Sequence, residues 1–155
     1  MCGGPPAVNR PVLITFKVDA KRLYDANLDP ETISQTDLDT YCYLTDDNTP
    51  PGSIPSGGNL NDFTSKVYDG NTVTWKGDNT ANDGYRVVLD SITNNATFFS
   101  AEPHGNSGRI TATINTGVTI GVEDTYTIGF HIDPPGNLPE TLVFGLDPKL
   151  RASND

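Results

Sequence analysis

The chain has 155 residues, of which 35% are hydrophobic and 19% are charged, and it contains 15 glycines and 12 prolines. This length suits one domain, and this composition favours short strands joined by many turns. Acidic residues outnumber basic ones 20 to 10, which leaves a formal net charge of −10 at pH 7. Because such a surface repels phosphate backbones and anionic lipids, we expect neither nucleic acid nor a membrane as a partner.

The chain ends and the cysteines indicate a simple organisation. We expect flexible tails at residues 1–10 and 153–155 around a single domain at residues 11–152. Cys2 and Cys42 make no disulfide framework, and no apolar run is long enough for a signal peptide or a membrane span. These features predict a cytoplasmic protein with reduced thiols.

Apolar side chains alternate with more polar ones from Val12 to Val18, which predicts a first strand with one buried face. Residues 19–39 then mix Asp, Asn, Pro and Thr with scattered Leu and Ile. They predict a long loop with at most one helical turn, around Ala20 to Leu23.

Eight further segments have strand character, with turn residues between them. They are residues 40–44, 62–68, 72–76, 85–92, 97–100, 109–115, 125–132 and 141–146. Asp69-Gly70 joins two of them through a tight turn and predicts either a β-hairpin or a corner between sheets. The predicted fold class is all-β, because sheets with one apolar face must pair those faces. We expect a single β-sandwich, immunoglobulin-like or jelly-roll-like, of about eight short antiparallel strands with long polar loops.

Side-chain patterns within these strands predict the core. Trp75, the largest side chain, is expected to anchor the interior, with sugar stacking as the alternative. Alternation over residues 126–132 predicts another strand with one buried face. In residues 85–92, Val87 and Ile92 fall on opposite faces, so we expect partial burial on both sides of that strand.

The histidines give no support for catalysis. His104 and His131 lie in no recognisable catalytic motif. A metal bound by Glu102, His104 and His131 is conceivable, but these residues lack the repeated spacing of ligand pairs. We therefore predict that the protein is not an enzyme and holds no transition metal.

Carboxylate and amide oxygens gather in polar loops, and such ligands suit calcium. The residues are Asp46, Asp47, Asp69, Asp78, Asn79, Asn82 and Asp83. The EF-hand pattern is missing, and backbone bonding by Asp and Asn in turns explains the same residues as structure. We expect no cofactor, with Ca²⁺ as the alternative.

Four stretches follow one another in an order similar to that of a known family. They are Val12 to Asp19; Tyr24-Asp25-Ala26-Asn27 followed by Tyr41-Cys42-Tyr43; Asp69 to Gly77; and Tyr126 to Phe130 followed by Thr141 to Gly145 and Asp147-Pro148. In this layout the chain resembles the bacterial AidA/PixA-type inclusion body proteins, which are small all-β proteins. The chain is shorter than the family pattern, and Leu146 stands where the family has a Trp before its closing Asp-Pro. The resemblance implies a cytoplasmic protein made in quantity and able to self-associate, with no catalytic residues to carry over.

Two functions follow as hypotheses. The first is a non-enzymatic, self-assembling protein of the AidA/PixA type whose partner is itself. Because the net charge opposes self-association, assembly should depend on salt, acid or a cation. The alternative is a calcium-assisted, lectin-like module that binds carbohydrate, with Tyr43, Tyr85, Tyr68 or Trp75 stacking on a sugar ring. A docking adaptor is a third hypothesis, which nothing in the sequence separates from the other two.

Overall fold

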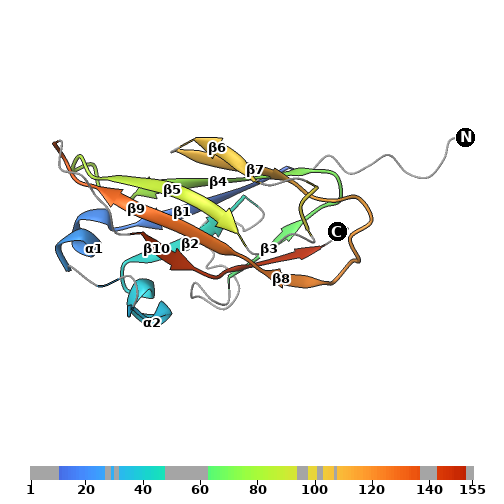
Figure 1. Ribbon diagram of the computed structural model, residues 1–155, viewed down its shortest axis with the longest axis horizontal. Helices are drawn as coiled ribbons and strands as arrows, with labels where there is room; N and C mark the ends of the chain where they lie inside the picture. Colours follow the sequence, from blue (N-terminus) through green and yellow to red (C-terminus); the bar gives the residue numbers. More distant parts are fainter. Residues whose placement is uncertain are drawn as a thin grey trace, which may run out of the picture.

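Strands dominate the computed structural model, which describes residues 11–26, 29, 32–47, 63–93, 98–100, 103–106, 108–136 and 143–152. Within these residues the chain forms eleven strands and two short helices (Figure 1). In chain order they are β1 (Val12–Val18), α1 (Ala20–Ala26), α2 (Gln35–Asp39), β2 (Cys42–Asp46), β3 (Thr64–Val67), β4 (Thr72–Asn79), β5 (Arg86–Thr93), β6 (His104–Asn106), β7 (Arg109–Thr113), β8 (Glu123–Thr125), β9 (Thr127–Asp133), β10 (Phe144–Leu146) and β11 (Lys149–Ala152). The predicted tails, Cys2, Glu102 and the polar loop at residues 48–61 lie outside the described residues.

The strands pair into three sheets. The largest has the order β2-β1-β4-β7-β6, and the two smaller ones have the orders β10-β9-β5 and β3-β11-β8. The all-β prediction is confirmed, but the prediction of about eight antiparallel strands is wrong. The described residues contain eleven strands, and β1 pairs with β4, and β3 with β11, in parallel. Parallel neighbours require long crossover connections, and no local pattern in a strand reports which distant strand it meets.

The two smaller sheets form one continuous layer. Leu146 pairs with Ile128, and Lys149 pairs with Thr125, so the same register runs through both sheets. Between these pairs, the Tyr126 N–H donates to the Pro148 carbonyl over 3.0 Å. Pro148 has no N–H group to donate back to Tyr126, so one hydrogen bond of the ladder is missing while the register continues unchanged.

The core lies between this layer and the five-stranded sheet, where β5 and β9 pass over β1 and β4 (Figure 1). The predicted inward residues are all buried: Val12, Ile14, Phe16, Val18, Tyr126, Ile128, Phe130 and Ile132. The Phe16 and Phe130 rings meet edge to face with centroids 4.6 Å apart. Trp75 is fully buried, as predicted, and its indole N–H donates to the Tyr126 hydroxyl over 2.9 Å.

A β-bulge corrects the expected faces of β5. The pairing of β5 with β9 shifts between Leu89 and Ser91. The extra residue moves Ile92 to the same side as Val87 and Leu89, and all three belong to the core. The period-two pattern had placed Ile92 on the opposite face, because a bulge leaves no mark in simple alternation.

The prediction that residues 19–39 hold at most one helical turn is wrong, because the segment contains α1 and α2. Helix α1 buries Ala20 and Leu23, and the Ala20 N–H donates to the Asn79 Oδ1 atom over 3.3 Å. Helix α2 begins with a capping box, in which Ser34 and Asp37 each accept a hydrogen bond from the backbone N–H of the other. The Ser-x-x-Asp spacing from Ser34 to Asp37 is the sequence signal that marks the N-terminus of α2.

The Asp69-Gly70 turn is the predicted corner between sheets, since β3 and β4 belong to different sheets. Gly70 has a φ of +72°, a conformation that favours glycine. The strand predicted at residues 97–100 is reduced, among its described residues, to one bridge between Phe99 and Ile114. Neither helix of the described chain is long and apolar enough to cross a bilayer.

Candidate functional site

The Asn79 side chain organises the loop that was a candidate calcium site. Its Oδ1 atom accepts from the backbone N–H groups of Ala20 and Ala81, each over 3.3 Å. Its Nδ2 atom donates to Asp83 Oδ1 over 2.7 Å and to the Tyr85 carbonyl over 3.0 Å. The Asn79 side chain therefore connects residues within the loop to one another and joins the loop to the start of α1. This is the structural role expected of Asn, whose side chain hydrogen-bonds to nearby backbone groups in turns.

The other candidate oxygens do not converge on one centre. Asp46 pairs with Ile14 and Asp78 with Lys17, and the three residue steps from Ile14 to Lys17 along β1 span about 10 Å. A calcium ion holds its ligands at about 2.3 to 2.6 Å, so Asp46 and Asp78 lie too far apart in this fold to share one shell. Calcium binding by Asp78, Asn79, Asn82 and Asp83 without the distant group stays the alternative to the expectation of no cofactor.

Each remaining carboxylate has a partner within the fold. Asp46 accepts from the Ser65 hydroxyl, and Asp47 Oδ1 accepts from the Leu13 N–H over 3.2 Å. Asp78 Oδ2 lies 3.3 Å from the Lys17 ammonium nitrogen. Asp69 Oδ2 accepts from the Gly117 N–H over 2.9 Å. These contacts join strands and turns to one another.

The candidate sugar-stacking residues fall into two groups. Trp75 and Tyr68 are buried, so the stacking alternative is wrong for both. Tyr85 is half-buried, and its ring centroid lies 5.7 Å from that of Tyr24. Tyr43 is 50% exposed and pairs on β2 with Lys17 of β1. Tyr43 is therefore the candidate aromatic that offers the most open surface.

His131 forms a cluster that sequence reasoning missed. Its Nδ1 atom lies 2.8 Å from Asp90 Oδ2, and its Nε2 atom lies 3.2 Å from Asp133 Oδ1. The two carboxylates flank opposite sides of the imidazole, so this arrangement ties β5 to β9 and does not present three ligands to one metal ion. His104 lies on β6, in the five-stranded sheet, whereas His131 lies in a smaller sheet. In the described part of the chain, no group of three or more His, Cys, Asp or Glu side chains is arranged to hold a metal ion.

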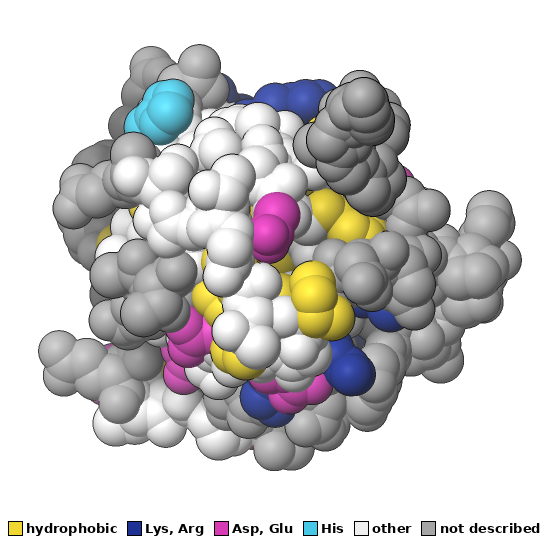
Figure 2. Space-filling view, turned by 90° about the vertical axis from the view of Figure 1, so that its right-hand side faces the viewer, with side chains coloured by type: hydrophobic (Ala, Val, Ile, Leu, Met, Phe, Trp, Pro, Cys, Tyr) yellow, Lys and Arg dark blue, Asp and Glu magenta, His cyan; other side chains and the backbone are white. Residues whose placement is uncertain are grey.

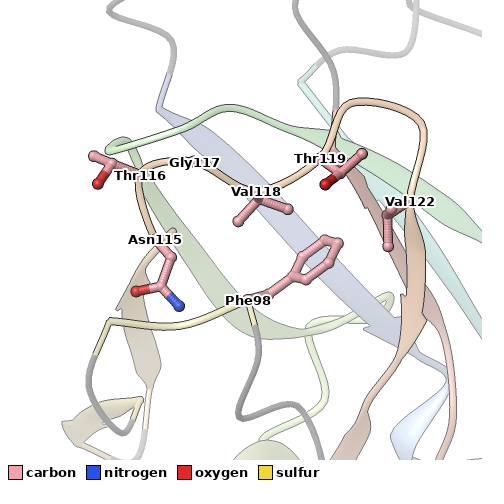
Figure 3. Close-up of a pocket in the computed structure, with 7 residues that line it drawn as sticks. All are labelled: Phe98, Asn115, Thr116, Gly117, Val118, Thr119 and Val122. Carbon is pink, nitrogen blue, oxygen red and sulfur yellow. The ribbon is translucent and has the colours of Figure 1, made fainter.

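A cavity of about 350 Å³ lies under an arch formed by residues 115–122 (Figure 3). Its lining is Phe98, Asn115, Thr116, Gly117, Val118, Thr119 and Val122. Figure 3 shows Val118 pointing toward the Phe98 ring. The sequence signal for this region is the run from Ile110 to Val122, which contains no charged residue.

The arch ends in two exposed apolar side chains beside β11. Ile120 is 49% exposed and Val122 is 42% exposed. The Gly121 N–H donates to the Ala152 carbonyl, and the Ala152 N–H donates to the Val122 carbonyl, which holds both beside β11. Figure 2 views this end, where apolar side chains in yellow gather near the centre, and acidic side chains in magenta lie among them and beside the basic ones in dark blue below.

The sheet β3-β11-β8 beside the arch carries charges of both signs. Lys66 and Arg151 are exposed neighbours in register on β3 and β11. Lys149 precedes Arg151 by two residues and points to the same side of the strand. Glu123 of β8 is exposed in register with Arg151, and Asp124 follows it, so three basic and two acidic side chains share these three short strands.

The described residues define an all-β protein, and a solved structure shares its fold along the whole chain. The inclusion body protein PixA from Burkholderia cenocepacia matches with a TM-score of 0.66 and 14% identity, over 98% of this chain and 100% of that one. The cysteine protease inhibitor EhICP2 from Entamoeba histolytica matches over 57% of this chain and 84% of its own, with 13% identity and a TM-score of 0.29. No family model matches the chain, and no curated protein matches it. The predicted resemblance to the AidA/PixA-type proteins is confirmed at the level of the fold.

Proposed function

We propose that the chain is a non-enzymatic, self-assembling protein of the inclusion-body type, whose partner is a further copy of itself in the cytoplasm. The observation that carries this proposal is the full-length fold likeness to PixA, which is described as an inclusion body protein. At 14% identity the likeness concerns the fold, so assembly itself is the step that needs an experiment.

Assembly should depend on conditions because of the net charge of −10. Copies of an acidic protein repel one another over a distance set by the Debye length, about 30 Å at 0.01 M salt and about 8 Å at 0.15 M. Moderate salt therefore removes most long-range repulsion between aspartates while leaving short contacts in place. Acid has the same effect by protonating carboxylates.

Sedimentation velocity over a series of protein concentrations tests the proposal. We expect a monomer at low salt and low concentration, and growth of the average mass with concentration at about 0.15 M salt. A protein that stays monomeric across salt, acid and millimolar calcium would contradict self-assembly.

The lectin alternative gains no support from the described residues. Two of its four candidate aromatics are buried, and Asn79 uses both of its polar side-chain atoms within the fold. Calcium binding by the loop at residues 77–84 remains the alternative to the expectation of no cofactor, and it is tested below.

A further inference from the structure

We infer that the cavity under the arch at residues 115–122 binds a small uncharged organic molecule. The ligand class is an apolar body, the size of a single ring with a short substituent, that carries a hydroxyl or amide group. This site goes beyond the proposed self-assembly and does not depend on it. Three features support it: the arch is held at both ends, the lining is uncharged, and the volume suits a small ligand.

Hydrogen bonds hold the arch at both of its ends. Near its start, the Gly117 N–H donates to Asp69 Oδ2 over 2.9 Å, which joins the arch to the corner between β3 and β4. Near its other end, the Gly121 N–H donates to the Ala152 carbonyl over 2.8 Å, which joins the arch to β11. Because the backbone is fixed on both sides, the cavity exists before a ligand arrives. Binding sites for small molecules are usually preformed in this way.

The lining combines an apolar surface with a few polar groups. Phe98 is 2% exposed, and Figure 3 shows its ring between Val118 and Val122. Thr119 lies between the two valines along the arch and adds a hydroxyl group to the lining. Asn115 adds an amide at the start of the arch. An apolar body that packs against Phe98 and the valines, with its polar group directed to Thr119, matches this lining.

The volume of the cavity limits the size of the ligand. It is about 350 Å³, at the lower end of the range of about 300 to 1,000 Å³ that is typical of small-molecule sites. Apolar protein cavities of about 150 Å³ hold benzene, so this one has room for a ring with a short substituent. A longer molecule, such as a sugar chain or a peptide, would extend beyond the arch into solvent.

The absence of charge in the lining decides the chemistry of the ligand. None of the seven lining residues is charged, and the sequence has no charged residue from Ile110 to Val122. Asp69, whose carboxylate bonds to Gly117, is not part of the lining. A charged group that entered the cavity would lose hydration without gaining an ion pair. An anion would also be repelled by the net charge of −10.

Titration of the isotope-labelled full chain with benzyl alcohol, followed by nuclear magnetic resonance, tests this inference. Low salt and low protein concentration keep the chain in the monomeric form expected above. We expect saturable shifts of the amide signals of Phe98 and of residues 115–122, with a dissociation constant on the order of 1 mM for so small a probe. Benzoate and benzylamine have a similar size but carry a charge at neutral pH, and each should bind at least about tenfold more weakly.

A substitution that fills the cavity has a matched control on the same arch. Val118 points toward the Phe98 ring, so Val118→Trp should weaken binding of benzyl alcohol at least about tenfold. Ile120 is 49% exposed and does not line the cavity, so Ile120→Trp adds the same side chain outside it and should change the affinity by less than about threefold. Val122→Trp is a second filling variant, in case Val118→Trp does not fold. Melting curves confirm that each variant is folded before it is titrated.

Three outcomes would overturn the site. The first is the absence of a saturable shift with benzyl alcohol up to about 10 mM, or equal binding of benzoate. The second is that a folded filling variant binds the probe as well as Ile120→Trp does, because the shifts would then come from another surface. The third is that Val118→Trp reduces self-association while the unmodified chain binds no probe, which would make the arch a contact between copies. A monomeric chain that binds benzyl alcohol would contradict the proposed function and leave this site intact.

Discussion

The two ends of the molecule use polar groups in opposite ways. At the helical end, polar side chains stabilise the fold: Asn79 bonds to Ala20 and Asp83, and Ser34 and Asp37 cap α2. At the arch end, the backbone makes the connections to β11, and Ile120 and Val122 project into solvent. The side chain at the centre of the loop that looked most like a ligand site thus stabilises the fold, whereas the uncharged run from Ile110 to Val122 supplies two of the four exposed large hydrophobic side chains of the described residues.

The core between the ends should be the most sensitive region. Trp75→Ala removes a fully buried indole that contacts both Phe99 and Tyr126. We expect a loss of about 3 to 5 kcal/mol in the free energy of unfolding, measured by urea denaturation. A loss below about 1 kcal/mol would mean that the two layers do not depend on this side chain.

The hydrogen bond between the layers should give the next largest effect. Tyr126→Phe keeps the ring but leaves the buried Trp75 N–H without its acceptor, which costs about 1 to 3 kcal/mol of unfolding free energy. Tyr43→Phe is the matched control, because Tyr43 is half exposed, and it should change stability by less than about 0.5 kcal/mol. Equal effects for the two variants would contradict a stabilising bond at Tyr126.

The same residue should make folding sensitive to alkali. Burial raises the pKa of the Tyr126 phenol and of the Cys42 thiol above their usual ranges. The folded chain therefore keeps protons that the unfolded chain releases above about pH 8.5 for Cys and about pH 10 for Tyr. Stability should be complete below these values and fall as the pH rises, and Tyr126→Phe should flatten the fall above about pH 10. Thiol reagents should label Cys42 only after unfolding.

Removing the Asn79 hydrogen bonds at the helical end should have a smaller effect on the free energy of unfolding. Asn79→Ala removes the acceptor for Ala20 and Ala81 and the donor to Asp83, and we expect a loss of about 1 to 2 kcal/mol of unfolding free energy. Asn82→Ala, at an exposed position in the same loop, should stay within about 0.5 kcal/mol. Hydrogen exchange should show the extra opening in α1, and uniform opening elsewhere would contradict the local role of Asn79.

Calcium should give the smallest effect. Because Asn79 and Asp83 already bond to each other, we expect no change in melting temperature between millimolar calcium and a chelator. A calcium-dependent rise that Asp78→Asn removes would restore the calcium site as a function of this loop.

Local sequence patterns were sufficient where the fold depends on burial within one strand. The alternation from Val12 to Val18 and from Tyr126 to Ile132 marked the inward faces correctly, because a pleated strand places every second side chain on the same side. The size of the Trp75 side chain indicated its central place, because a large apolar side chain is expected to anchor the core. The turn at Asp69-Gly70 could be located but not assigned, since a hairpin and a corner use the same residues.

Tertiary structure decided everything that joins distant residues. No local pattern in the sequence reports the parallel pairing of β1 with β4. The same is true of two side-chain contacts: Asn79 accepts from the N–H of Ala20, 59 residues away, and His131 approaches Asp90 across 41 residues. The bulge that turns Ile92 inward is set by its partner strand β9. The arch lies beside β11 only because the backbone of Ala152 bonds to Gly121 and Val122, which are about 30 residues earlier in the chain. A sequence reports the face that each strand must bury, but which strands meet depends on how the whole chain closes around its core.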